Sequence, residues 1–237
     1  MKPSFVYFDL DNTLLDHISA EGKAQHSTYN EYPELQQVPI DQWLEQYQVV
    51  NHLLWESYQR DEIDRYELQS ARFRNTMQKF ELDTAKSEEI GEFYMSSYRE
   101  YWSWVDGAQS VLKLVSSKVK SGIITNGFKE TQELKFDKLN IKDYCSPLLI
   151  TEEIGKLKPH PIVFDVATEK AGVPREEILY VGDSFSSDII GGNNAGWKTA
   201  WFTALIDKEE SRNGNTEVSP DFEFDKFEDL LNYLELK

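Results

Sequence analysis

The sequence predicts an α/β fold, a doubly wound parallel sheet of the Rossmann-like type with a helical-bundle domain inserted into it. Short apolar runs recur between segments of helical periodicity, which is the pattern of successive βαβ units. Two acidic residues, two positions apart, follow the first apolar run. A long stretch of helical character then separates that run from the next one. We therefore expect a Rossmann-like core of residues 1–15 and 106–237, and a helical domain of residues 16–105.

The first run, Phe5–Phe8, is four apolar residues long and predicts a short buried strand. Asp, Asn and Thr disfavour strands, so the strand should end near Asp9. Asp9 and Asp11 then lie at its carboxyl end, where open α/β sheets bind ligands. In an extended backbone the two carboxylates point to the same side and repel unless a cation or shared proton compensates. This pattern favours Mg²⁺, although an ordinary strand-to-turn exit would look similar.

The inserted stretch has aromatic residues at three- and four-residue steps, as in amphipathic helices. Asp41, which follows Pro39, is the expected N-cap of one of these helices. The positions that we expect in the helical core are Trp43, Tyr47, Val50, Leu54, Tyr58, Tyr66, Phe73, Met77, Phe80, Tyr94, Tyr98 and Trp102.

The rest of the chain alternates between helical and strand patterns. We expect helices at 107–118, 129–139, 161–171, 186–195 and from about 225, and strands at 119–125, 147–150, 178–181 and 198–202. Right-handed crossovers would place the carboxyl ends of all strands at one edge of the sheet.

Polar residues follow each of these strands. They are Thr125, Asn126 and Gly127 after the second strand, Lys158 after the third, and Asp183 with Asp188 after the fourth. Each group has a simple structural explanation: a turn, a solvated lysine and a helix N-cap. Their shared position after strands nevertheless predicts that they meet Asp9 and Asp11 in one site.

Composition restricts the partners of this chain. The 237 residues carry a formal net charge of −17, which argues against a nucleic-acid polymer as ligand. No apolar run approaches the ~18 residues of a membrane span, and Asp9 and Asp11 interrupt what would be a signal peptide. Cys145 is the single cysteine, so an intrachain disulfide is impossible. We expect a cytoplasmic protein.

The four groups together resemble the signature motifs of the haloacid dehalogenase superfamily. The motifs are Asp9-Leu10-Asp11-Asn12-Thr13, Ile123-Ile124-Thr125-Asn126-Gly127, Lys158-Pro159 and Gly182-Asp183-Ser184-Phe185-Ser186-Ser187-Asp188. The helical insert looks like the C1-type cap of this superfamily. Lys158 is preferred to Lys156 because it directly precedes Pro159, and nearby His160 is expected to be exposed.

The resemblance implies a role for each site residue. Asp9 would be the nucleophile, and Asp11 the general acid and then the general base. Thr125 and Lys158 would bind the transferring phosphoryl group, with Asn126 and Gly127 also binding substrate. Mg²⁺ would contact Asp9, the backbone carbonyl of Asp11, and Asp183, while Asp188 would hold Lys158 or a metal-bound water.

A narrower resemblance, to the pyrimidine 5'-nucleotidase branch, rests on residues 51–58, 68–73, 122–128 and 188–196. It implies a phosphatase acting on small phosphorylated metabolites, namely nucleoside 5'-monophosphates. We separately expect a monomer or weak homo-oligomer. Phe128, Trp55, Tyr58 and Arg72 would contact the substrate or only pack within the protein. A sugar-phosphate or phosphoglycolate-type phosphatase, a phosphomutase and a catalytically idle binding protein remain as alternatives. Asp11 favours phosphoryl transfer, since dehalogenases of the superfamily lack it.

Overall fold

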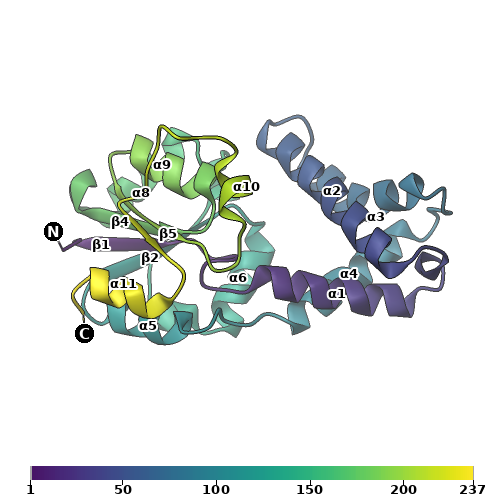
Figure 1. Cartoon of the computed structure of the whole chain (residues 1–237), viewed down its shortest axis with the longest axis horizontal. Coiled ribbons are helices and arrows are strands. Elements are labelled where there is room, and N and C mark those ends of the chain that lie inside the picture. The colour runs from purple at the N-terminus through teal and green to yellow at the C-terminus, as the bar shows by residue number, and fades with distance from the viewer. Residues whose placement is uncertain (1, 237) are drawn as a thin grey trace. The chain divides into compact units, whose positions relative to one another are not determined.

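The computed structural model describes residues 2–236, and the chain forms two compact units (Figure 1). One unit, the sheet unit, contains the residues up to Asp16 together with those from Ser103 onward. The other, the helical unit, is His17–Trp102. The chain thus divides at 16/17 and 102/103, where the sequence placed its boundaries at 15/16 and 105/106.

The sheet unit is built on six parallel strands in the order β3-β2-β1-β4-β5-β6, which confirms the predicted fold class. The strands are β1 (Phe5–Phe8), β2 (Lys120–Thr125), β3 (Leu148–Ile150), β4 (Ile178–Gly182), β5 (Lys198–Phe202) and β6 (Phe222–Phe224). β1 lies between β2 and β4, so its register is fixed from both sides. The strand that carries the first acidic motif is therefore central in the sheet.

Helices cover both faces of this sheet (Figure 1). They are α5 (Ala108–Ser116), α6 (Lys129–Lys138), α7 (Thr151–Ile154), α8 (Pro161–Ala171), α9 (Ile190–Asn194), α10 (Lys208–Arg212) and α11 (Phe227–Tyr233). Because side chains alternate along a strand, Val6 and Phe8 pack with α5 and α11, whereas Phe5 and Tyr7 pack with α8. Both faces of β1 are thus buried, as its unbroken apolar sequence requires.

Several elements of the sheet unit differ from the sequence expectation. The segment expected as one helix at 186–195 is a π-helical turn, Phe185–Ile189, followed by the short helix α9. β6 and α10 were not predicted, because three and five residues are too short to show a periodicity. The last helix begins at Phe227 rather than near residue 225.

The helical unit consists of α1 (His17–Glu31), α2 (Ile40–Gln59), α3 (Arg65–Lys79) and α4 (Ser87–Glu100). Its core is a cluster of rings, in which the Phe73 centroid lies 5.2 Å from that of Tyr47, 5.3 Å from that of Tyr94 and 6.3 Å from that of Trp43. The spacing of aromatic residues therefore identified this core correctly.

Three details of the helical unit differ from the expectation. Tyr66, in the first turn of α3, is 71% exposed, and the Arg65 guanidinium lies over its ring. Leu54, Tyr58 and Phe80 are only half-buried. Asp41 lies inside the first turn of α2, and Pro39 is the N-cap, since its carbonyl accepts the Trp43 amide at 3.0 Å.

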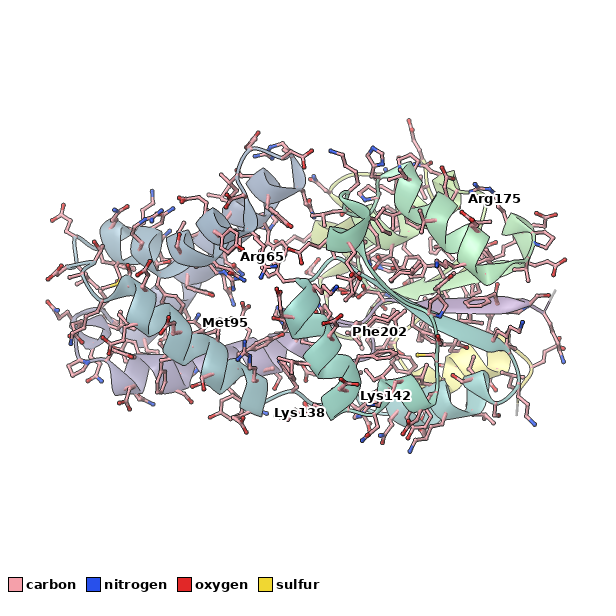
Figure 2. All side chains as sticks on the ribbon, turned by 180° about the vertical axis from the view of Figure 1, so that it is seen from behind. Arg65, Met95, Lys138, Lys142, Arg175 and Phe202 are labelled. Carbon is pink, nitrogen blue, oxygen red and sulfur yellow. The ribbon has the colours of Figure 1, made fainter. Side chains whose placement is uncertain are left out.

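Side chains fill the space around the sheet, as Figure 2 shows for Phe202, which lies inside the sheet unit. Lys138 and Lys142 lie at the surface of the same unit. Over residues 2–236, we find no helix that has both the length and the apolar character needed to cross a bilayer.

We predict that Gly122→Ala destabilises the sheet unit by about 1–3 kcal/mol through overpacking. A Cβ at this position of β2 would lie 2.7 Å from a Tyr7 ring carbon and 2.8 Å from the Pro147 carbonyl oxygen. Chemical denaturation monitored by tryptophan fluorescence measures the effect. Gly22→Ala is the control, because a Cβ in that helical position has no atom within 4 Å. It should be neutral or stabilising by about 0.5–1 kcal/mol, and equal losses in the two variants would contradict the prediction.

Candidate active site

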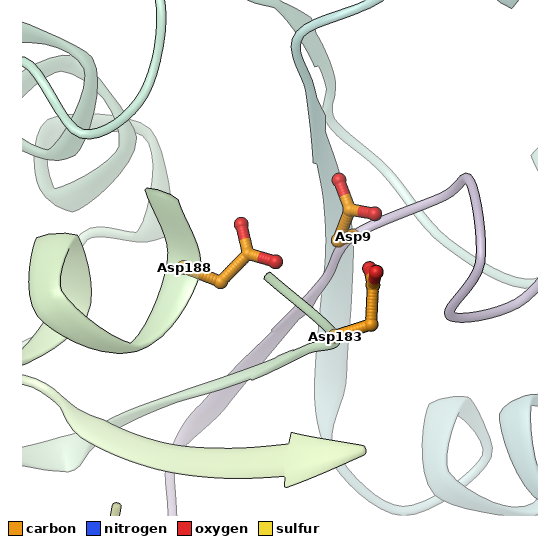
Figure 3. A group of neighbouring side chains, drawn as sticks. All are labelled: Asp9, Asp183 and Asp188. Carbon is orange, nitrogen blue, oxygen red and sulfur yellow. The ribbon is translucent and has the colours of Figure 1, made fainter. Parts of the chain in front are cut away.

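Three carboxylates converge at the carboxyl edge of the sheet. Asp9 follows β1 and Asp183 follows β4, its neighbour, while Asp188 lies in the π-helical turn. The Asp9 amide continues the ladder by donating to the Val181 carbonyl at 2.8 Å. One oxygen of each carboxylate lies within 4.8 Å of the others, and all three side chains are buried (Figure 3). Oxygen ligands at this spacing fit a hard divalent cation.

Lys158 brings a positive charge into this cluster. Its Nζ lies 2.6 Å from Asp9 Oδ1 and 2.8 Å from Asp188 Oδ1, and it also donates to the Tyr180 hydroxyl at 2.7 Å. Lys158 is 2% exposed, whereas Lys156 is an exposed residue. Of the two lysines in this segment, it is therefore Lys158 that reaches the carboxylates.

The side chain of Asn126 holds the backbone of Lys158. Its Oδ1 accepts the Lys158 amide at 2.8 Å and the Thr151 hydroxyl at 3.0 Å, and its Nδ2 donates to the Lys158 carbonyl at 3.1 Å. The loop after β2 thereby fixes the loop after β3. The amide group of Asn126 thus contacts the Lys158 backbone and the Thr151 hydroxyl, and the substrate-binding role that we expected for this residue stays a prediction.

The end of β2 supplies a buried hydroxyl and a tight turn. Thr125 is buried at the last position of the strand, and its Oγ1 accepts the Gly127 amide at 3.3 Å. A Cβ on Gly127 would lie 1.6 Å from Nε2 of Gln132, so a side chain at this position would displace Gln132.

Neighbouring groups also orient Asp183 and Asp188. The Thr13 hydroxyl donates to Asp183 Oδ1 at 3.0 Å, and the Ser184 amide donates to Asp188 Oδ2 at 3.0 Å. A Cβ on Gly182 would lie 2.3 Å from Asp188 Oδ2, so the glycine permits this carboxylate to approach β4. The π-helical turn, a feature frequent at functional sites, places Asp188 here.

The carboxylate of Asp11 has a different environment. Its Oδ1 lies 2.5 Å from Nζ of Lys135, and its Oδ2 accepts from Nε2 of Gln132 at 2.8 Å. Both partners belong to α6 and are buried. The carboxylate of Asp11 does not belong to the cluster of Asp9, Asp183 and Asp188, although Asp11 is only two residues from Asp9 in the sequence.

Three contacting residues were not singled out from the sequence: Tyr180, Gln132 and Lys135. In the sequence, Tyr180 is one residue of an apolar run that predicts a strand. Only the folded structure shows that its hydroxyl contacts Lys158. Gln132 and Lys135 resemble any polar helix residues, and the sequence offers no signal that would distinguish them.

Burial and mutual repulsion make the carboxylates poor anions in the absence of a cation. Burial raises the pKa of Asp9 to about 7, with Asp188 adding to the effect and Lys158 opposing it. Burial, Asp9 and Asp188 raise the pKa of Asp183 well above its usual range. Burial lowers the pKa of Lys158, but Asp188 and Asp9 outweigh it, so this lysine stays charged. Three carboxylates thus face one ammonium group, and a bound divalent cation would balance the remaining charge.

A parallel α/β sheet with a buried aspartate cluster and a lysine at its carboxyl edge defines a Rossmann-like protein whose site can bind a cation and an anion. The chain belongs to the haloacid dehalogenase-like hydrolase family, whose model matches residues 6–202. This confirms the resemblance seen in the motifs, and the chain is accordingly an enzyme.

Curated relatives and a solved structure agree with this assignment. The chain is 34% identical to pyrimidine 5'-nucleotidase YjjG of Escherichia coli, over 86% of this chain and 88% of that protein. It is 28% identical to pyrimidine 5'-nucleotidase PynA of Streptococcus pneumoniae, over 98% and 94%. A crystal structure of the HAD-hydrolase YfnB of Bacillus subtilis, bound to magnesium, has a TM-score of 0.83 at 24% identity, with 99% of both chains covered. That likeness shows the fold.

We predict that metal-free protein loses stability relative to an Asp183→Asn variant as pH rises from about 4 to about 7. In this window the folded wild type retains protons that the unfolded chain has released, since the pKa of Asp9 is raised from 3.8 to about 7 and that of Asp183 is also raised. Mg²⁺ should therefore raise the melting temperature more above pH 7 than at pH 5. At a hundredfold excess over its Kd, the rise above pH 7 should be about 5–11 °C. Differential scanning fluorimetry in EDTA or Mg²⁺ measures both effects. An equal Mg²⁺ response in Asp183→Asn would contradict the prediction.

Proposed function

We propose that this enzyme is a Mg²⁺-dependent phosphatase that hydrolyses nucleoside 5'-monophosphates, with a preference for pyrimidines, through an aspartyl-phosphate on Asp9. The observation that carries the proposal is the buried cluster of Asp9, Asp183 and Asp188 with Lys158 across it, in a chain of this hydrolase family. The substrate class is supported by the two relatives named as pyrimidine 5'-nucleotidases.

The donor set suits the proposed ion, because Mg²⁺ prefers oxygen ligands and usually takes only one or two carboxylates from the protein. Asp9, Asp183 and the backbone carbonyl of Asp11 would hold it. When bound, Mg²⁺ supplies positive charge against the phosphoryl oxygens and against the repelling carboxylates. Asp188 would remain with Lys158, 2.8 Å away.

The first half of the reaction transfers the phosphoryl group to the enzyme. An oxygen of Asp9 forms a bond to phosphorus, and the ester P–O bond breaks. The leaving alkoxide receives a proton from the carboxyl group of Asp11 and departs as the nucleoside. Lys158 and the Thr125 hydroxyl would bind the oxygens of the transferring group.

The second half regenerates the enzyme. Water attacks the phosphorus of the aspartyl-phosphate and gives a proton to the Asp11 carboxylate. The bond between phosphorus and the Asp9 oxygen breaks, so inorganic phosphate leaves and Asp9 is restored. A single acid–base residue contributes only ~10²–10⁴-fold, so most of the acceleration must come from charge stabilisation by the cation, Lys158 and backbone amides.

Charge and composition agree with a small substrate inside a cell. The net charge of −17 disfavours polyanions but leaves a small phosphate ester to be bound by local charges. Cys145 is buried and free, which suits the reducing cytoplasm. Substrate choice is assigned to the helical unit by the resemblance to C1-type caps.

We predict that Asp9→Asn lowers phosphatase turnover by more than about a thousandfold, because the amide cannot form the aspartyl-phosphate. Steady-state release of inorganic phosphate from UMP measures it. Asp225→Asn, a change at an exposed aspartate of the same unit, is the matched control and should keep full activity. Substantial activity in Asp9→Asn would show that another residue is the nucleophile.

We further predict that UMP and dTMP are hydrolysed in Mg²⁺ and not in EDTA, and faster than sugar phosphates, phosphoglycolate or glyceraldehyde 3-phosphate. A panel of phosphate monoesters, ranked by kcat/KM, provides the measurement. A preference for a sugar or triose phosphate would support the phosphatase function but contradict the nucleotidase specificity. If no monoester is hydrolysed, the proposed phosphatase function is wrong.

A further inference from the structure

Two buried residues of α6 contact the carboxylate of Asp11, one on each oxygen. Lys135 Nζ lies 2.5 Å from Oδ1, and Gln132 Nε2 lies 2.8 Å from Oδ2. The two residues are one helical turn apart, so they project from the same side of α6. They lie 121 and 124 residues from Asp11 along the chain, so the contact forms only when the chain folds and could not be predicted from the motif around Asp11.

The burial of Lys135 makes this contact unusual. The side chain of Lys135 is 2% exposed, whereas that of Asp11 is 24% exposed. A buried ammonium group loses its hydration and needs a partner, and such lysines are rare. α6 therefore carries an ammonium group into the interior, where it meets the carboxylate that follows β1.

We propose that Lys135 and Gln132 are positioning residues for Asp11, which orient its carboxyl group as the acid–base of the phosphoryl-transfer reaction. This inference rests on the proposed phosphatase function. Two donors on two oxygens fix the plane of a carboxyl group, whereas a single donor would leave it free to rotate. The orientation of a catalytic group strongly affects the reaction rate, since a misplacement of about 1 Å can lower the rate about 10²-fold.

The two partners can serve both forms of Asp11. In the carboxylate form, Gln132 donates from Nε2, as in the structure. When Asp11 carries a proton on Oδ2, a half-turn of the Gln132 amide would present Oε1 as acceptor. That atom has no hydrogen-bond partner among the residues described, so the turn breaks no contact of Oε1. Lys135 keeps Oδ1 in both forms.

Gly127 links this contact to the phosphoryl-binding loop. Gln132 occupies the space that a Cβ on Gly127 would need, at 1.6 Å from Nε2. The Gly127 amide in turn donates to Thr125 Oγ1 at 3.3 Å. Residues proposed to bind the phosphoryl group and residues that orient its acid–base are thus packed against one another.

The test compares substrates that differ in their need for an acid. The alkoxide of UMP must be protonated as it leaves, whereas p-nitrophenolate and acetate leave without a proton. Because kcat/KM reports the steps up to phosphoryl transfer, misplacing Asp11 lowers it for UMP only. Lys135→Met should lower kcat/KM for UMP about 10²-fold and change that for p-nitrophenyl phosphate or acetyl phosphate less than about threefold. Asp11→Asn should show the same selectivity.

Matched variants separate positioning from folding. Lys135→Arg should recover most of the loss with UMP, and Gln132→Leu should reproduce the selectivity to a smaller extent. Lys138→Met, at the exposed surface of the same helix, should have no effect. Equal losses on the ester and the activated phosphates in Lys135→Met, or in Gln132→Leu if the first variant does not fold, would overturn the proposal. A wild type inactive on all of these substrates would remove the phosphatase function, and the positioning role with it.

Discussion

The ion pairs of Lys158 with Asp9 and Asp188 are the interaction on which the rest of the site depends. Without a cation between them, buried carboxylates this close would repel and take up protons instead. The lysine is itself held at its backbone by Asn126 and at its Nζ by Tyr180. The ammonium group of Lys158 reaches Asp9, Asp188 and Tyr180 only if strands β1, β2 and β4 are paired in this register and the loop after β3 lies beside them.

Two glycines of the motifs leave space for neighbouring side chains of the site. Gly182 makes room for Asp188 beside β4, and Gly127 makes room for Gln132. Close approach of two charged or polar groups needs a backbone without a side chain at these points. In each case a glycine of a motif lies beside a side chain of the site: Gly182 beside Asp188, and Gly127 beside Gln132.

Sequence reasoning predicted the sheet, the helical core and most of the residues around Lys158, because these depend on local patterns. Apolar runs such as Phe5–Phe8 show buried strands, and the spacing of Trp43, Tyr47 and Phe73 shows a helical face. It could not predict the partners of Asp11, since Lys135 looks like any helix lysine until the tertiary fold is known. Nor could it predict the π-helical turn at Phe185–Ile189, whose local sequence is compatible with an ordinary helix.

The backbone around the insertion has a consequence for how such enzymes diversify. Where the helical unit begins and ends, the chain is closed by hydrogen bonds from the Asp16 amide to the Ser103 carbonyl, at 3.0 Å, and from the Val105 amide to the Leu14 carbonyl, at 2.9 Å. Because these bonds join the two ends of the inserted helical unit, the insertion places little constraint on the sheet. The length and sequence of the inserted unit can therefore change while the carboxylates and the lysine on the sheet keep their positions.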